Sequence, residues 1–221
     1  YDPSRGDDHD QPTNFVAEGY TSVKTKNTTP YGTYQVVKIA ESADEAEAAI
    51  GKPNGIVVVA SNMTASSWSI AKGSSKLILN NNAVLSGDTK YPQSILLGSN
   101  KTLTIDGEGT IVGPKYDKPT GNRATLWLNG GSVAINGNVS VKNGGRNPGN
   151  TVDAGIMVFK GKVNIYSGYF YAANDATGVP NPCIHLAGDY NRTCILNIYG
   201  GVFESETETN NYLINVQDSK S

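Results

Sequence analysis

The residues that come closest to a catalytic cluster are His185, Asp189 and Arg192. A base beside a cation is the arrangement with which a polysaccharide lyase abstracts a proton. His185 alternates with the apolar residues Ile184 and Leu186, so we expect its side chain to point outward from a strand. An exposed histidine of this kind is more often inert than catalytic, and we therefore expect no catalytic residue in this group.

Glycoside hydrolysis would need two carboxylates about 5–9 Å apart. Asp106 and Glu108 lie in a single Asp-Gly-Glu-Gly turn, and a role in that turn explains both. The run Asp7-Asp8-His9-Asp10 contains metal-binding residue types, but no further ligands follow at a fixed spacing. Pectinase-type signatures such as Gly-His-Gly are absent. The sequence therefore predicts no enzymatic activity, no metal site and no cofactor.

A second group of residues has the chemistry to bind a glycan or a protein partner. It lies in the longest and most variable loops of a repeated unit described below, and insertions in repeat proteins collect on one face, often the binding face. Ordinary solvated loops are the alternative explanation. The candidate residues are Tyr91, Tyr116, Arg123, Arg146, Asp153 and Asp175.

The N-terminal arm, residues 1–15, is polar and has no apolar periodicity. Such a segment buries too little apolar surface to order itself, so we expect a neighbouring subunit to hold it. Its contacts would come from Asp2, Arg5 and Asp10, with Phe15 and Val16 anchoring its root. The Arg-Gly-Asp tripeptide in this arm is best explained as a chance match.

The elements that must position these residues are short strands in a repeat of about thirty residues. In residues 101–113, Leu103 and Ile105 alternate with threonines, which is typical of a strand with one buried face. Equivalent first-strand positions are Leu77, Leu103, Val133, Val163 and Leu196. Equivalent third-strand positions are Ile95, Leu126, Ile156, Ile184 and Leu213. A fixed period with three short strands and no long helix predicts an all-β parallel β-solenoid of about six coils.

The same alignment predicts the core and a column of stacked side chains. We expect eight side chains to point inward: Leu103, Ile105, Val133, Ile135, Val163, Ile165, Leu196 and Ile198. The turn after the first strand aligns Asn80, Asp106, Asn136, Tyr166 and Tyr199. Stacked amides followed by stacked tyrosines indicate a structural column. A sugar-binding role for the tyrosines would require the column to face solvent.

An antiparallel sandwich is the alternative, but it needs neither a fixed period nor the same turn in each repeat. The phrases LTIDGEGTI and LNIYGGVF, with the repeat around them, resemble the right-handed parallel β-helix group with the pectin-lyase-like fold. The likeness covers about residues 42–216 and is nearest to non-enzymatic modules of phage virion and gut bacterial surface proteins. It implies the fold more strongly than any function.

The region before the repeats predicts two strands and a helix. Residues 20–24 and 33–39 alternate around a Pro-Tyr-Gly turn, which indicates a hairpin. Ser42 and Glu45 form a capping box for a helix over 42–50 that would cover the open end of the stack. The C-terminal end has no equivalent, so a partner or further chain would cover it. The predicted organisation is an arm (1–15), a β segment (16–41) and the solenoid (42–221).

Composition excludes two partner classes. The net charge of 221 residues is −2, which gives no electrostatic footprint for nucleic acid or an anionic membrane surface. No apolar run reaches the roughly 18 residues needed to span a bilayer, so we expect no membrane insertion. Cys183 and Cys194 are compatible with a disulfide or with two small buried hydrophobes.

These observations predict a non-catalytic structural or surface-display protein. The first expectation is a virion decoration, fibre or tail component, whose partners are neighbouring subunits of its own kind or capsid and tail proteins. The second is a bacterial cell-surface adhesin or a glycan-binding module, located outside the cell. A polysaccharide lyase or hydrolase is the third.

Overall fold

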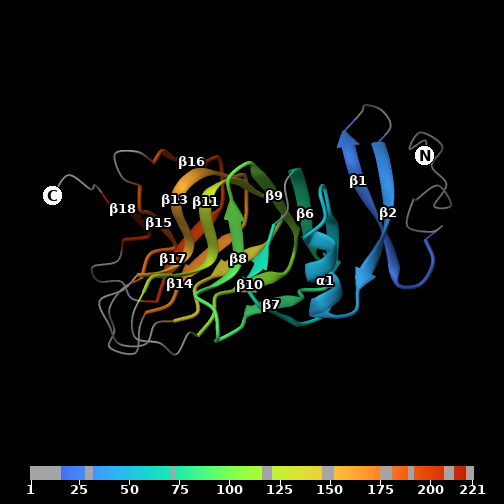
Figure 1. Ribbon diagram of the computed structural model, residues 1–221, viewed down its shortest axis with the longest axis horizontal. Helices are drawn as coiled ribbons and strands as arrows, with labels where there is room; N and C mark the ends of the chain where they lie inside the picture. The colour runs from blue at the N-terminus through green and yellow to red at the C-terminus, as the bar shows by residue number, and fades with distance from the viewer. Residues whose placement is uncertain are drawn as a thin grey trace.

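The computed structural model of the chain is a parallel β-solenoid that follows a β-hairpin and one short helix (Figure 1). It describes residues 16–27, 32–70, 73–115, 121–145, 152–174, 181–188, 192–206 and 212–217. The predicted fold class is confirmed, with about four turns of solenoid instead of the six expected. The strands at the two ends of the third face are short: β5 (Trp68–Ser69) has two residues and β18 (Ile214–Val216) has three.

The solenoid has three faces of parallel strands. The first face holds β3 (Ile56–Val59), β6 (Gly73–Leu79), β9 (Lys101–Gly107), the second halves of β11 (Arg123–Ile135) and β13 (Asp153–Ile165), and β16 (Cys194–Ile198). The second face holds β4 (Met63–Ala65), β7 (Val84–Gly87), β10 (Thr110–Val112), β12 (Ser140–Lys142), β14 (Tyr169–Ala172) and β17 (Val202–Ser205). The third face holds β5, β8 (Gln93–Gly98), the first halves of β11 and β13, β15 (Ile184–Leu186) and β18.

Strand register tests the predicted repeat alignment. It confirms the equivalence of four first-face positions, Leu103, Val133, Val163 and Leu196. The first repeat differs, because Leu77 pairs with Ile105, and its predicted equivalence with Leu103 is wrong by two residues. On the third face, Ile184 pairs with Ile214 and not with the expected Leu213.

The core is a continuous column of inward-pointing apolar side chains. Six of the eight predicted core residues are fully buried: Leu103, Ile105, Val133, Ile135, Val163 and Ile165. Leu196 is only partly buried, and Ile198 is 42% exposed, which corrects the prediction for the last turn. Both still occupy inward positions of the register, beside Val163 and Ile165, but they lie on the last level of the described chain, which no further described turn covers.

The turn after the first face requires glycine at position 107, directly after Asp106. Gly107 has φ +106°, and a Cβ there would lie 2.1 Å from the Leu79 carbonyl oxygen, so only glycine fits. Asn80 is not part of the column, because Asp106 pairs with Ile78. The left-handed residues of that first turn are Asn81 and Asn82, both with φ 54°. The expected column therefore begins at Asp106.

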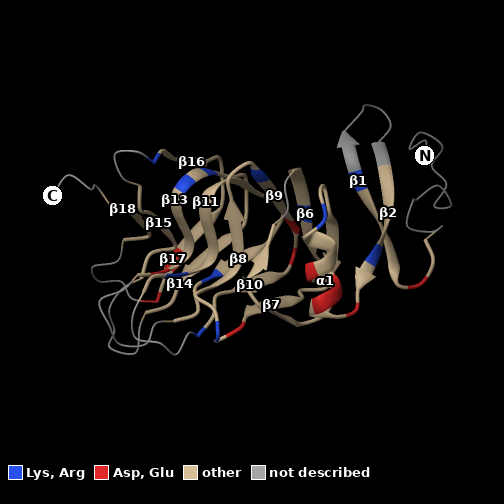
Figure 2. Cartoon of the chain, in the orientation of Figure 1, with Lys and Arg blue, Asp and Glu red and all other residues tan. Residues whose placement is uncertain are grey.

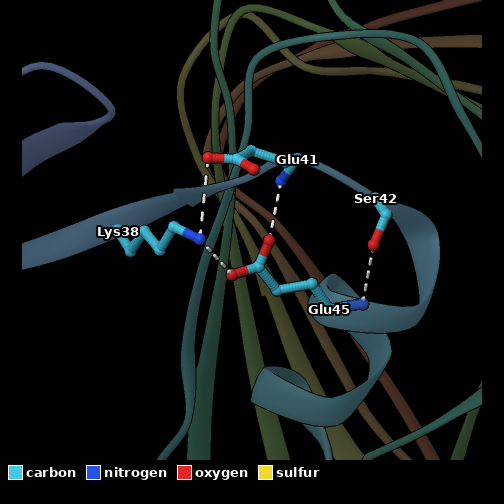
Figure 3. Close-up of polar contacts among 4 residues, drawn as sticks. All are labelled: Lys38, Glu41, Ser42 and Glu45. Atoms are coloured by element: carbon cyan, nitrogen blue, oxygen red, sulfur yellow. Dashed lines mark hydrogen bonds and ion pairs between the residues drawn. The ribbon is translucent and has the colours of Figure 1, made fainter.

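The helix α1 (Ala43–Ile50) covers one end of the core, as predicted. The Ser42 hydroxyl accepts a hydrogen bond from the Glu45 backbone N–H at 3.2 Å (Figure 3). The Glu45 carboxylate departs from the standard box, because it accepts from the Glu41 N–H and also pairs with Lys38 at 2.9 Å. These contacts fix the entry of the helix. Ala46 and Ile50 then pack into the core with no exposed area.

The predicted hairpin is present as β1 (Tyr20–Asn27) and β2 (Gly32–Ala40), which pair antiparallel. Val23 and Val37 on one side of the hairpin pack in a cluster with Val58 of β3. Only two residues of β2, Ile39 and Ala40, continue the first face by pairing with β3. The hairpin therefore stands at the α1 end of the solenoid, away from β15 to β18 (Figure 1).

Candidate functional site

The predicted binding residues do not form one exposed surface. Tyr91 is 40% exposed, in agreement with a surface loop. Arg123 and Asp153 are fully buried, so their prediction as exposed binding residues is wrong. Val16 is half-buried. The others lie outside the described residues: Tyr116, Arg146, Asp175, Asp2, Arg5, Asp10 and Phe15.

Arg123 and Asp153 are buried at the starts of two adjacent strands of the third face. Arg123 opens β11, Asp153 opens β13, and the two are direct partners in the parallel register. Opposite charges at adjacent levels of a stack favour each other more strongly inside a protein than in water. The pair is explained as part of the packing of this corner and does not offer a free surface for a ligand.

Asparagine side chains hold the same corner together. The Asn143 amide donates to the Ala173 carbonyl at 2.9 Å and accepts from the Ala173 N–H at 2.7 Å. Asn181 donates to the same carbonyl at 3.0 Å and accepts from the Asp153 N–H at 3.3 Å. These bonds satisfy backbone groups at the bases of the loops after the second face, so the amides have a structural role.

The structure describes two residues of the candidate lyase cluster, His185 and Arg192. His185 is 1% exposed and lies beside Met157 in the register of the third face, which corrects its predicted outward exposure. A small apolar cluster that includes Met157, Trp127 and Phe159 covers this side of the face. Burial lowers the pKa of the imidazole, and a contact with Gln217 opposes that change. Arg192 is exposed, and Asp189 lies outside the described residues.

Of the two carboxylates in the Asp-Gly-Glu-Gly turn, Asp106 has structural partners. Asp106 accepts a hydrogen bond from the Gly107 N–H at 2.9 Å and pairs with Lys76 at 3.1 Å. Glu108 is exposed at the tip of the turn. In the described ranges, no three His, Cys, Asp or Glu side chains are placed to hold a metal ion. No disulfide joins Cys183 to Cys194, and the thiol of Cys194 donates to the Val158 carbonyl at 3.2 Å.

The tyrosine part of the predicted column is present and faces solvent. Tyr166 and Tyr199 stack with ring centroids 4.9 Å apart and an angle of 8° between the rings. Their exposed fractions are 50% and 67%. Solvent exposure was the condition for a sugar-binding role, because the apolar face of a sugar ring packs against an accessible aromatic ring.

A second group of aromatic residues lies on the outer side of the second face. We call Lys142, Tyr169, Tyr171 and Glu204 the tyrosine cluster. Lys142 of β12, Tyr171 of β14 and Glu204 of β17 are partners across three adjacent strands. The Lys142 ammonium lies 5.9 Å from the centre of each tyrosine ring, within the range of a cation–π contact.

Hydrogen bonding fixes one ring of the tyrosine cluster. The Tyr169 hydroxyl donates to the Glu204 carboxylate at 2.6 Å, and this bond raises the pKa of Tyr169 to about 12. Burial, followed by the charges of Glu206 and Glu204, raises the pKa of Tyr171. Both phenols are therefore neutral donors at physiological pH. The cluster combines two aromatic rings, an ammonium group and a carboxylate on one rigid sheet.

The sequence contains a signal for the tyrosine cluster, which lies on strands and not in the loops. In the run Tyr169-Phe170-Tyr171, the alternation places Phe170 inward and both tyrosines outward. The equivalent position carries Lys142 one repeat earlier and Glu204 one repeat later. A comparison of the outward positions of successive repeats therefore predicts that Lys142, Tyr171 and Glu204 lie side by side.

The chain matches no protein-family model, no curated protein and no solved structure. No helix within the described segments is long and apolar enough to cross a membrane.

Proposed function

We propose that the protein is a non-catalytic structural component of a surface assembly, of the virion decoration, fibre or tail type. The observation that supports this proposal best is the β1–β2 hairpin at the α1 end, whose two sides have different surroundings. One side packs on the solenoid through Val23 and Val37. The opposite side exposes three apolar residues, Tyr20 at 44%, Tyr34 at 38% and Val36 at 58%. Exposed apolar side chains on a projecting element suit contact with a neighbouring subunit.

The cationic residues of this side support the same role. In the register, Tyr20 lies opposite Lys38 and Tyr34 lies opposite Lys24. Apolar side chains interleaved with charged ones are compatible with a non-obligate interface, which is about as apolar as the rest of a protein surface. The N-terminal arm would extend this contact, with Val16 close to its root. The solenoid behind the hairpin serves as a rigid spacer, because each level is packed against the next.

The experiment is co-sedimentation with purified virions or cell envelopes of the source organism. We expect the wild-type protein to sediment with the particles, and a Tyr34→Ser, Val36→Ser double variant to lose at least about tenfold in bound fraction. Tyr91→Ser is the matched control, since Tyr91 is a similarly exposed tyrosine on the solenoid. Full binding by the double variant would contradict attachment through the hairpin.

A glycan-binding module is the second candidate, and the tyrosine surfaces favour it. Tyr166 and Tyr199 present exposed rings, and the tyrosine cluster adds charged hydrogen-bonding groups. Binding of immobilised glycans that is lost in Tyr199→Ala and retained in Tyr34→Ala would support this function. Retained binding in Tyr199→Ala would exclude the exposed stack as the sugar site.

A further inference from the structure

A hollow of about 270 Å³ lies where the hairpin, α1 and β3 meet. Only Ile39 and Ala40 of β2 pair with β3, so the rest of β2 is not held in the sheet of the first face. The apolar walls of the hollow come from all three elements: Val37, Ala40, Ala48, Ala49, Ile56 and Val57. Protein interiors contain few voids larger than a water molecule, so a space of this size is a candidate binding site.

The hollow stays open because its walls carry short side chains. Three of the six wall residues are alanines. The larger Ile50 of α1 packs into the solenoid core and has no exposed area, so it does not fill the space. Val37 and Val57 are only 8% and 1% exposed, which shows that packing holds the walls in place. The hollow is therefore preformed, as most ligand sites are.

Charged residues of both signs surround the hollow, as Figure 2 shows around α1 and the adjoining end of β2. One oxygen of the Glu45 carboxylate accepts from Lys38 at 2.9 Å, and the other accepts from the Glu41 N–H at 2.9 Å (Figure 3). Lys52 also lines the hollow and is exposed, and its side chain forms no ion pair with a described residue. The edge of the hollow therefore offers one ammonium group to an acidic ligand group.

We propose that the hollow receives an apolar side chain of leucine or phenylalanine size from the neighbouring subunit, and that a carboxylate of the same segment pairs with Lys52. The proposal rests on the attachment through the hairpin and specifies the chemistry of the partner segment. An apolar cavity of about 150 Å³ is large enough to bind benzene, so about 270 Å³ can hold either side chain. Apolar anchors of this kind, buried in a pocket, supply much of the binding energy of an interface.

Lys38 connects the hollow with the exposed side of the hairpin. It lies opposite Tyr20 in the antiparallel register, and alternation places Tyr34 and Val36 on the same side. Its side chain also lines the hollow. A subunit that covers Tyr20 and Val36 would therefore reach the edge of the hollow as well. This continuity favours a side chain of that subunit over a freely diffusing small molecule.

The test uses N-acetyl-leucine as a probe, because it carries an aliphatic side chain beside a carboxylate. Binding to the full chain is followed by NMR of ¹³C-labelled alanine methyl groups. We expect saturable shifts at Ala40, Ala48 and Ala49, with a dissociation constant in the millimolar range that is usual for a fragment of this size. N-acetyl-leucinamide lacks the carboxylate and should bind about threefold more weakly. Lys52→Gln should remove this difference, whereas Lys90→Gln, at an exposed position on the solenoid, should keep it.

Filling the hollow provides the second part of the test. Ala49→Leu should raise the dissociation constant of the probe at least about tenfold and should lower the fraction that sediments with the particles by a similar factor. Ala48→Leu is a second filling variant, at an exposed position of α1 where a larger side chain is compatible with folding. Ala134→Leu on the outer side of β11 is the matched control and should behave as the wild type.

The outcomes separate this proposal from the attachment on which it rests. Absence of saturable shifts, or wild-type behaviour of both filling variants, would overturn the proposal for the hollow and leave attachment through the hairpin possible. Shifts that require deletion of residues 1–14 would assign the hollow to the arm of the same chain and would overturn it as well. Loss of sedimentation in Ala49→Leu with full sedimentation of the Tyr34→Ser, Val36→Ser variant would support the hollow and contradict the hairpin contact.

Discussion

Replacing Ile135 by alanine probes the core column where it is most enclosed. The side chain has no exposed area and lies in register between Ile105 and Ile165 of the adjacent strands. The truncation removes three carbon atoms, a loss of about 2 kcal/mol in transfer free energy. The strands on both sides are hydrogen-bonded and cannot collapse into the space, so a cavity term of about 2 kcal/mol is added. We expect a loss of about 4 kcal/mol in the free energy of unfolding.

The assay is urea-induced unfolding followed by circular dichroism, with the slope m compared between variants. Thr104→Ala is one control, because Thr104 points outward on β9 and its loss should cost less than about 1 kcal/mol. Ile198→Ala is the sharper control, since Ile198 occupies the same column and is 42% exposed. The loss for Ile198→Ala should be at most about half that for Ile135→Ala. Equal midpoints for Ile135→Ala and Thr104→Ala would refute the register.

Three further predictions follow from other parts of the structure. Ser42→Ala removes the hydroxyl that accepts a hydrogen bond from the Glu45 N–H, so it should lower the free energy of unfolding by about 1 kcal/mol in the same assay. An unchanged unfolding midpoint would contradict the capping role of Ser42. Burial lowers the folded-state pKa of His185 below its usual value of about 6.5, so the stability it contributes is present above that pH and is lost as the pH falls through the folded pKa. The protection factors of the β15 amides, which correct for the slower intrinsic exchange at low pH, should therefore fall on acidification in the wild type and much less in His185→Leu. Pectin, alginate and capsule polysaccharides should yield no product in reducing-end and lyase absorbance assays, and turnover abolished by Asp189→Asn or Arg192→Ala would overturn the non-catalytic proposal.

Period-two alternation predicted the solenoid and most of its core because each repeat buries one face of its strands. Alternation does not distinguish shifts of two residues, however, since both registers keep the same side chains inward. This is why Leu77 could be aligned with Leu103 when it pairs with Ile105. Local capping chemistry predicted α1 correctly from Ser42, because a helix N-terminus depends mainly on its nearest residues.

The site residues were harder to predict because alternation was taken to separate core from solvent. On the third face both sides of β13 are covered. His185 of the adjacent strand β15 lies beside Met157 of β13 and is buried as well, although it alternates with core residues. Arg123 and Asp153 have charges that indicate exposure, but they meet as register partners in the interior. The tyrosine cluster required residues from three repeats to be compared at one outward position, which no single segment reveals.

The most direct test of the proposed assembly role is deletion of residues 1–14 from the full chain, followed by measurement of its incorporation into purified particles of the source organism. The solenoid core begins well after this segment, so circular dichroism should show an unchanged fold. We predict that the truncated protein is not incorporated, because the proposed attachment assigns this polar segment of the sequence to the contact with a neighbouring subunit. Incorporation equal to that of the full chain would contradict the attachment role and would place the glycan-binding module first.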